Sequence, residues 1–187
     1  MNLVIFGPPG AGKGTQSGYI VKKYNLFQIS TGELLRNEIK NQTKLGIEIS
    51  SIINSGSLVS DEIVSNIIQK FISDKSYKDK LIFDGYPRSL SQAKNLDLLL
   101  NSSNQKINLI FFLNVNKNTI IKRIEKRKSL EKRSDDNLDT ILRRYETYME
   151  TTKPVLDFYS KNINFHEIDG ALEIDEITRK IDIFINV

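Results

Sequence analysis

Apolar runs and amphipathic segments alternate along the chain, and this alternation predicts an α/β fold. The most hydrophobic stretch is INLIFFLNV, residues 107–115, and a continuous apolar run of this kind is typical of a strand buried on both faces of a parallel sheet. A shorter run, NLVIF at residues 2–6, ends at a glycine and fits the same description. Strands are predicted at residues 2–6, 27–29, 80–84, 107–115 and 164–168.

Segments with helix-start signals or helical spacing lie between the predicted strands. STGE at residues 30–33 matches a capping box, in which Ser30 caps a helix and Glu33 bonds back to the backbone. Residues 137–161 carry one apolar stripe, which predicts a single long helix. Helices are predicted at residues 13–24, 30–40, 43–55, 60–73, 89–100, 117–127, 137–161 and 174–185.

The order of these elements predicts one domain with three layers. Strands that alternate with helices indicate a parallel sheet, here of five strands, covered by helices on both faces. The length of 187 residues fits a single domain. Two segments look like insertions into this core, a helical one at residues 30–59 and a short polar one at residues 128–136.

Composition and charge narrow the possible ligands. The chain has no cysteine, which excludes disulfides and thiolate metal sites and fits a reducing compartment. No apolar run approaches the ~20 residues of a membrane span, so we expect a cytoplasmic protein without a membrane partner. The net charge is +4, and Lys and Arg are spread along the chain, whereas a nucleic-acid binder usually gathers them on one face. We therefore expect small anionic ligands and no nucleic acid.

The nine residues GPPGAGKGT, 7–15, hold four of the ten glycines and two of the four prolines. They follow a predicted buried strand, precede a predicted helix, and fit G-x-x-x-x-G-K from Gly7 to Lys13. Glycines let the backbone turn tightly and point successive N–H groups inward, and the following helix adds its positive end. The pattern predicts a nucleotide phosphate-binding loop in which Lys13 reaches the terminal phosphates.

The loop departs from the common pattern at one position. Gly14 follows the lysine where a hydroxyl residue is usual, and the hydroxyl comes one residue later, at Thr15. The usual direct ligand of Mg²⁺ is therefore displaced, and we expect contact to the metal through water. Asp84 ends the predicted strand KLIFD, where a Walker-B-like carboxylate would hold hydrated Mg²⁺, although aspartate before glycine is also a common turn residue.

Arginines supply a second set of anion-binding candidates. Arg88 closes DGYPR, residues 84–88, at the carboxyl edge of the predicted sheet, where ligands of open parallel sheets bind. Arg123 and Arg127 lie four residues apart on one face of a predicted helix. Any one of Arg36, Arg123 or Arg144, taken alone, is equally compatible with a structural role, whereas the position of Arg88 beside a proline-fixed turn favours binding. Further candidates are Arg36, Arg133 and Arg144.

Together these motifs resemble the adenylate kinases of the short-lid type, in the order in which that family carries them. The resemblance covers nearly the whole chain and implies a P-loop α/β fold, an AMP-binding segment at residues 30–59 and a lid at residues 128–136. It also implies the reaction Mg·ATP + AMP ⇌ 2 ADP, catalysed by a monomer. The matching stretches are GPPGAGKGT, ISTGELLR (29–36), GSLVSDEIV (56–64), FDGYPRSLSQA (83–93), RIEKR (123–127) and RSDDN (133–137).

The resemblance implies roles for individual residues. Arg123 would lie on the ATP adenine, where a planar guanidinium can stack. The residues implied for ATP are Gly10, Ala11, Gly12, Lys13, Gly14, Thr15, Arg123, Arg127 and Leu172. Those implied for AMP are Thr31, Arg36, Ser57, Leu58, Val59, Gly85, Tyr86, Pro87, Arg88, Gln92, Arg133 and Arg144. The catalytic set would be Lys13, Arg88, Arg127, Arg133 and Arg144, with Asp135 and Asp136 orienting lid arginines and waters on Mg²⁺.

Two other functions stay open at the level of sequence. A UMP/CMP kinase of the same fold would carry a similar lid, but it typically has a smaller residue at position 31 and lacks glutamine at position 92. Thr31 and Gln92 therefore favour AMP, although Gln92 also completes the capping box SLSQ. An ATP-driven switch or NTPase would usually place a hydroxyl directly after the loop lysine, and Gly14 argues against that class.

The predicted lid also departs from the family pattern. Short-lid relatives tend to place glycines between the two arginines, whereas KSLEK at residues 128–132 has none. Arg127 and Arg133 keep the expected separation, so we expect the lid to close, over a smaller range or as an extension of the preceding helix. Asp135 and Asp136 could also cap the helix that follows.

Overall fold

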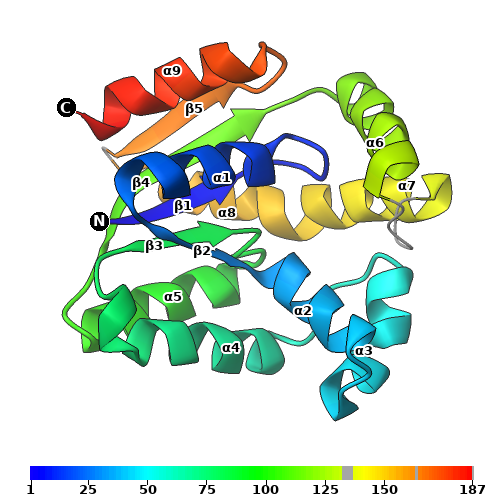
Figure 1. Ribbon diagram of the computed structural model, residues 1–187, viewed down its shortest axis with the longest axis horizontal. Helices are drawn as coiled ribbons and strands as arrows, with labels where there is room; N and C mark the ends of the chain where they lie inside the picture. The colour runs from blue at the N-terminus through cyan, green and yellow to red at the C-terminus, as the bar shows by residue number, and fades with distance from the viewer. Residues whose placement is uncertain (132–136, 163, 187) are drawn as a thin grey trace.

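The computed structural model describes residues 1–131, 137–162 and 164–186. Within them, parallel strands form one sheet in the order β2-β3-β1-β4-β5 (Figure 1). The predicted three-layer α/β fold with five parallel strands is confirmed, and each predicted strand agrees with an observed one to within a residue at either end. The strands are β1 (Asn2–Phe6), β2 (Phe27–Ser30), β3 (Leu81–Asp84), β4 (Ile107–Asn114) and β5 (Phe165–Asp169).

Helices cover both faces of the sheet (Figure 1). One face carries α1 (Lys13–Tyr24) and α9 (Ile174–Ile185). The other carries α4 (Asp61–Ser73), α5 (Leu90–Ser102) and α8 (Lys153–Tyr159). The remaining helical elements are α2 (Thr31–Lys40), α3 (Lys44–Asn54), the short turn η1 (Lys75–Tyr77), α6 (Lys117–Glu131), α7 (Leu138–Thr147) and the turn η2 (Tyr148–Thr152).

Strand β1 illustrates why the strands appear in the sequence as continuous apolar runs. Leu3 and Ile5 belong to the core on the side of α1 and α9, whereas Val4 and Phe6 belong to the core on the other side. None of the four side chains is more than 3% exposed. Because burial of one such side chain stabilises the fold by ~1.5–3 kcal/mol, apolar residues are favoured at successive positions.

The register of the strands brings three segments together at the carboxyl edge of the sheet. Asp84, the last residue of β3, pairs with Ile5 of β1 and with Ser30 of β2. The loop after β1, the loop after β3 and the start of α2 therefore lie side by side. This is the edge at which ligands of open parallel sheets bind.

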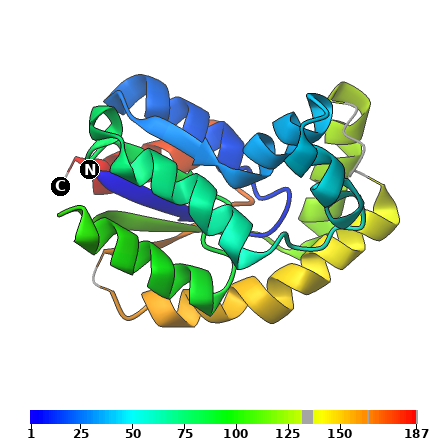
Figure 2. The same cartoon turned by 90° about the horizontal axis from the view of Figure 1, so that it is seen from below.

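Two pairs of helices flank this edge. Figures 1 and 2 show α2 with α3, and α6 with α7, at the same end of the molecule. Helix α6 was predicted to end at residue 127 but continues to Glu131. The stretch KSLEK lacks the glycine that would interrupt it, and most of its residues favour a helix. Part of the predicted lid is thus helical, and residues 132–136 lie outside the described part of the chain.

Two local predictions were wrong. Ser30 is the N-cap residue of α2, but its side chain makes no capping hydrogen bond, because Ser30 is still the last residue of β2 and the chain passes directly from strand to helix. The single helix predicted at residues 137–161 is divided into α7, the π-helical turn η2 and α8. Pro154 lies in the first turn of α8 and has no N–H to donate, so the helix widens before it.

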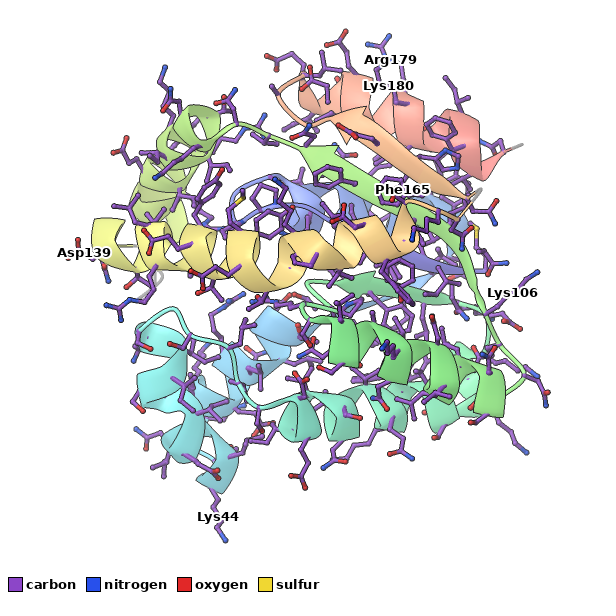
Figure 3. The ribbon with its side chains drawn as sticks, turned by 180° about the vertical axis from the view of Figure 1, so that it is seen from behind. Lys44, Lys106, Asp139, Phe165, Arg179 and Lys180 are labelled. Carbon is purple, nitrogen blue, oxygen red and sulfur yellow. The ribbon has the colours of Figure 1, made fainter. Side chains whose placement is uncertain are left out.

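The surface carries lysines on several elements. In Figure 3, Lys44 on α3, Lys106 before β4 and Lys180 on α9 point away from the body of the molecule. All three are exposed, and they come from separate parts of the chain. In the ranges that the structure describes, no helix combines the length and the apolar character needed to cross a bilayer.

Candidate active site

The loop between β1 and α1 has the backbone of an anion-binding turn. Gly12 is the N-cap of α1 and has a φ of 93°, in the left-handed region that favours glycine. The N–H of Ala11 donates to the carbonyl of Pro8 at 3.1 Å and closes the turn. Gly14 and Thr15 are exposed in the first turn of α1. The loop therefore presents the positive end of a helix toward the carboxyl edge of the sheet.

Lys13 lies where this loop meets the helix. Its Nζ donates to the carbonyls of Gly7 at 2.8 Å and Pro8 at 3.1 Å. Desolvation lowers the pKa of Lys13 from 10.5 to about 8, and Asp84 opposes this shift. The positive charges of Arg88, Arg144 and Arg127 lower the pKa further. Lys13 is thus one of several cations drawn together in one region, an arrangement that favours a bound polyanion.

Asp84 faces the start of α1. Its side chain is only 7% exposed, and its Oδ2 accepts a hydrogen bond from Nε2 of Gln28 at 2.9 Å. A Cβ atom at Gly14 would lie 3.7 Å from the same oxygen. The carboxylate is therefore close to the position at which the usual P-loop hydroxyl would stand.

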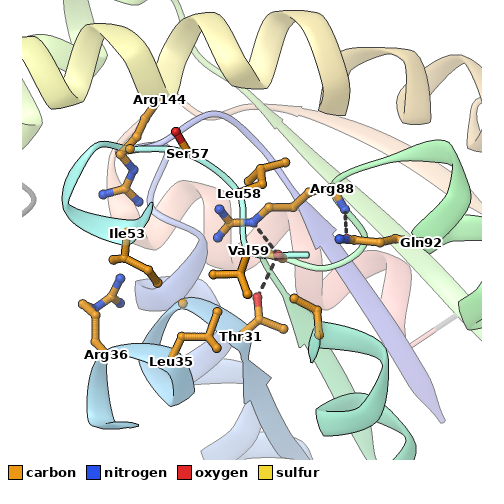
Figure 4. Close-up of a pocket in the computed structure, with 14 residues that line it drawn as sticks. Thr31, Leu35, Arg36, Ile53, Ser57, Leu58, Val59, Arg88, Gln92 and Arg144 are labelled. Carbon is orange, nitrogen blue, oxygen red and sulfur yellow. Dashed lines mark hydrogen bonds between the residues drawn. The ribbon is translucent and has the colours of Figure 1, made fainter. Parts of the chain in front are cut away.

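A cavity, which we call cavity A, opens between α2, α3 and the loop after β3 (Figure 4). One part of its wall is apolar and the other part is polar or cationic. Its apolar residues are Leu35, Ile53, Leu58, Val59 and Val64. Its polar and small residues are Thr31, Gly32, Arg36, Gly56, Ser57, Gly85, Arg88, Gln92 and Arg144.

The backbone carbonyl of Gly85 organises the polar part of cavity A. It accepts hydrogen bonds from Oγ1 of Thr31 at 2.9 Å and from Nε of Arg88 at 2.7 Å (Figure 4). Gly85 has a φ of 71°, and a Cβ atom there would lie 2.9 Å from Nη2 of Arg88. Glycine adopts this backbone conformation without strain, and a Cβ atom would displace the Arg88 guanidinium. The Arg88 N–H in turn donates to Oε1 of Gln92 at 2.7 Å.

Three guanidinium groups converge on cavity A. Figure 4 shows Arg36, Arg88 and Arg144 turned toward the same space from α2, the loop after β3 and α7. A Cβ atom at Gly32 would lie 3.2 Å from Nη1 of Arg36 and 3.6 Å from Nη2 of Arg88, so these two groups flank the same backbone position. Such a cluster suits a phosphate, whose oxygens accept several charge-assisted hydrogen bonds.

A second cavity, cavity B, adjoins the phosphate loop. Arg88 and Arg144 line cavity B as well as cavity A. The two cavities therefore meet at these arginines, with Lys13 on one side and the apolar wall on the other. The residues that line cavity B are Ile5, Phe6, Gly7, Pro9, Lys13, Gly56, Leu58, Gly85, Pro87, Arg88, Arg144, Thr147, Tyr148 and Thr152.

The other sequence candidates take varied positions. Arg123 reaches from α6 to the phosphate loop, where Nη1 donates to the carbonyl of Ala11 at 3.4 Å. Arg127 lies one turn further along α6, and Leu172 packs half-buried against the core before α9. Tyr86 is 1% exposed and lines neither cavity; its hydroxyl donates to the carbonyl of Gln92. The remaining candidates, Arg133, Asp135 and Asp136, lie outside the described residues.

The hydrogen-bond partners of several residues in this region carry no signal in the sequence. Gln28 bonds to Asp84, and Oγ1 of Thr152 donates to the carbonyl of Arg88 at 3.0 Å. Asp61 accepts a hydrogen bond from Nε2 of Gln92 at 2.6 Å. Each is an ordinary polar residue in its own segment, and only the packing of distant elements gives it this partner.

Comparison with known proteins agrees with this arrangement. The adenylate kinase family model matches residues 5–164. Adenylate kinase from Pelagibacter ubique (strain HTCC1062) is 49% identical, with 100% of both chains aligned. Adenylate kinases from Mycoplasma mycoides subsp. mycoides and Fusobacterium nucleatum subsp. nucleatum are 42% and 39% identical, over 90% and 97% of this chain and 91% and 96% of theirs. The similarity to these adenylate kinases extends along the whole chain and agrees with a glycine-rich loop beside a cavity with converging arginines. The chain therefore belongs to the adenylate kinase family.

Proposed function

We propose that cavity A binds AMP, that cavity B and the phosphate loop bind the phosphates of ATP, and that the phosphoryl group passes between them. As a member of the adenylate kinase family, the chain is an ATP:AMP phosphotransferase that forms two ADP. One observation supports this division of the site above the others. Arg88 and Arg144 line both cavities, so a group bound between them is held by both arginines.

Cavity A has the polarity that AMP requires. Leu35, Val59 and Val64 offer an apolar surface for a planar base, and Thr31 and Gln92 add hydrogen-bonding groups beside it. The guanidinium cluster, of Arg36, Arg88 and Arg144, would hold the phosphate. Ser57 and Leu58 would line the nucleoside, and Pro87 of the loop after β3 contributes from cavity B.

The other nucleotide would lie along the phosphate loop. The backbone of residues 10–15 and Lys13 would bind the ATP phosphates, with Arg127 adding charge from α6. Arg123 already contacts the loop at Ala11, and its planar group could stack on the adenine. The backbone near Leu172 would touch the same base.

Transfer would then require little covalent work from the protein. An anionic oxygen of the AMP phosphate attacks the γ-phosphorus of ATP; the new P–O bond forms as the bond to the β–γ bridging oxygen breaks, so no base is needed. The arginines and Lys13 would balance the charge on the phosphoryl group in flight. Two unit charges at 4 Å interact by ~1 kcal/mol in water but by ~4 kcal/mol at an effective dielectric near 20, so exclusion of water strengthens each contact.

The residues around Asp84 fit a hydrated Mg²⁺ bound with ATP. The carboxylate is buried and close to Gly14, where a bulkier residue would fill the space. We propose that Asp84 and Thr15 hold the ion through water. When bound, Mg²⁺ neutralises phosphate charge and fixes the orientation of the phosphate chain.

The lid would complete the site. We propose that Arg127, Arg133 and Arg144 surround the phosphates when the lid closes, and that Asp135 and Asp136 orient the lid arginines. Two features support this. Arg127 and Arg133 keep the separation that the family carries, and α6 continues to Glu131, inside the predicted lid. Arg133→Ala should lower kcat by about 10³-fold, as loss of a phosphate-contacting arginine does. An unchanged kcat would remove the lid from the mechanism.

We further propose that the enzyme works as a cytoplasmic monomer. The support for a monomer is the resemblance to the adenylate kinase family. Light scattering coupled to size-exclusion chromatography should give a mass near 21.4 kDa.

A coupled assay tests the proposed function. ADP formation is measured with ATP and each of AMP, CMP and UMP, with and without Mg²⁺, and also with ATP alone. AMP should be the preferred acceptor, and ADP should not form without a monophosphate. Faster transfer to CMP or UMP would indicate a pyrimidine monophosphate kinase, and ADP formation from ATP alone would indicate an NTPase. A bisubstrate mimic that joins two adenosines through a phosphate chain should inhibit; failure to bind it would exclude a shared site.

A further inference from the structure

Asp61 joins the N-terminus of α4 to the N-terminus of α5. Its Oδ1 accepts a hydrogen bond from Nε2 of Gln92 at 2.6 Å, and its Oδ2 accepts from Oγ of Ser89 at 3.3 Å and from Oγ of Ser91. Gln92 is only 4% exposed and lines cavity A, whereas Asp61 lies at the surface behind it. Asp61 itself does not line cavity A. Any influence of Asp61 on a ligand in cavity A therefore acts through Gln92.

The Gln92 amide is held at both ends by partners that cannot exchange roles. Its Oε1 accepts from the backbone N–H of Arg88 at 2.7 Å, and its Nε2 donates to the Asp61 carboxylate. A backbone N–H can only donate, and an ionised carboxylate can only accept. Rotation of the amide by 180° would set two donors against each other at Arg88 and two acceptors against each other at Asp61. The amide thus has one favoured orientation.

We propose that Asp61 is a positioning residue that fixes the donor and acceptor ends of Gln92 and so selects the purine in cavity A. This inference depends on the proposed binding of AMP there. In the fixed orientation, Oε1 and Nε2 each retain one hydrogen-bonding position. Adenine offers an amino donor beside a ring-nitrogen acceptor, a pattern that an amide matches with two hydrogen bonds.

A 6-oxopurine meets the same amide unfavourably. Guanine presents a carbonyl oxygen where adenine has its amino group, so this oxygen would face Oε1 of Gln92. Rotation of the amide would relieve the repulsion, and the Asp61 carboxylate opposes that rotation. Removal of the carboxylate should therefore weaken AMP binding and also relax the discrimination against GMP.

The test compares KM and kcat for AMP and GMP in the wild type, Asp61→Ala and Glu62→Ala. Glu62 is the matched control because it is an exposed acidic residue in the same first turn of α4. Both variants lose one favourable charge at the helix N-terminus, and Asp61→Ala also loses its hydrogen bonds to Gln92, Ser89 and Ser91, so it should unfold at a lower temperature than Glu62→Ala. Only Asp61→Ala should raise KM for AMP and lower the preference for AMP over GMP, each by about tenfold, with kcat for AMP changed less than about threefold. Asp61→Asn keeps an acceptor for Gln92 but adds a donor, so it should restore only part of the preference.

A double-mutant cycle with Gln92→Ala separates positioning from general disruption. If Asp61 acts through Gln92, Asp61→Ala should change the AMP-to-GMP preference no further when Gln92 is already alanine. Full additivity of the two changes, or an unchanged preference in Asp61→Ala, would overturn the inference. A wild type that does not prefer AMP as acceptor would instead contradict the proposed function.

Discussion

The charged form of Lys13 is expected to lower the free energy of unfolding of the enzyme. Desolvation and the positive charges of the neighbouring arginines disfavour its charged form, and its pKa is lowered from 10.5 to about 8. The folded state therefore binds the proton more weakly than the unfolded state does. The cost to the free energy of unfolding is fully present below pH 8 and disappears as the pH rises from 8 toward 10.5.

The magnitude follows from the two pKa values. Each pH unit between them corresponds to about 1.36 kcal/mol, so the charged Lys13 lowers the unfolding free energy by about 3 kcal/mol at pH 7. At pH 9.5 Lys13 is still largely protonated in the unfolded state only. The same linkage then lowers the unfolding free energy by about 1.4 kcal/mol. The difference between the two pH values is therefore about 2 kcal/mol.

Lys13→Met tests this expectation because methionine keeps the length of the side chain without its charge. Urea unfolding of the wild type and of the variant is measured at pH 7 and at pH 9.5. The advantage of the variant over the wild type should be larger at pH 7, by about 2 kcal/mol. The lost hydrogen bonds to Gly7 and Pro8 add an offset that is similar at both pH values, so they do not affect this difference.

Lys22→Met is the matched control, since Lys22 is an exposed lysine on the same helix. It should differ from the wild type by less than about 1 kcal/mol at both pH values. Lys13→Met should also lose phosphotransfer activity by at least about a hundredfold, since a charge proposed to contact the phosphates is removed. The reasoning is refuted if the difference between Lys13→Met and the wild type does not change with pH.

Three further substitutions probe the groups around Arg88 and Asp84. Gly85→Ala puts an L side chain on a backbone with φ near 71°, in the left-handed region, which should lower the unfolding free energy by about 1–2 kcal/mol. It also sets a methyl group against the Arg88 guanidinium, so both the melting temperature and the affinity for AMP should fall. An unchanged KM for AMP would contradict this. Thr152→Val removes the donor to the Arg88 carbonyl and should cost about 1 kcal/mol of unfolding free energy with a higher KM for AMP, whereas Thr152→Ser should behave as the wild type. Asp84→Asn keeps the shape of the side chain and an acceptor for Gln28 but removes the charge. The value of kcat should fall at least about tenfold, and the Mg²⁺ dependence of the rate should shift. Full activity at every Mg²⁺ concentration would exclude a role near the metal.

The features that sequence predicted well are those set within one segment. Strands β1 and β3 were predicted because both of their faces are buried, which makes apolar residues favourable at successive positions, as in residues 2–6 and 81–84. The phosphate loop was predicted because strand, glycines, lysine and helix follow one another along the chain, so its geometry is local. The arginines could be named as candidates, but nothing local distinguishes a binding arginine from a surface one.

Tertiary structure alone decided which polar groups meet. The pair Gln92–Asp61 spans 31 positions, Asp84–Gln28 spans 56 and Arg88–Thr152 spans 64, and each pair joins elements that strand order and helix packing bring together. The same is true of the meeting of cavities A and B at Arg88 and Arg144. The strands and the turn from β1 into α1 follow from the amino-acid sequence, because burial and backbone geometry act on neighbouring residues. The partners of the buried polar groups were settled only in three dimensions, because a hydrogen bond depends on the distance between two side chains and not on the identity of either one.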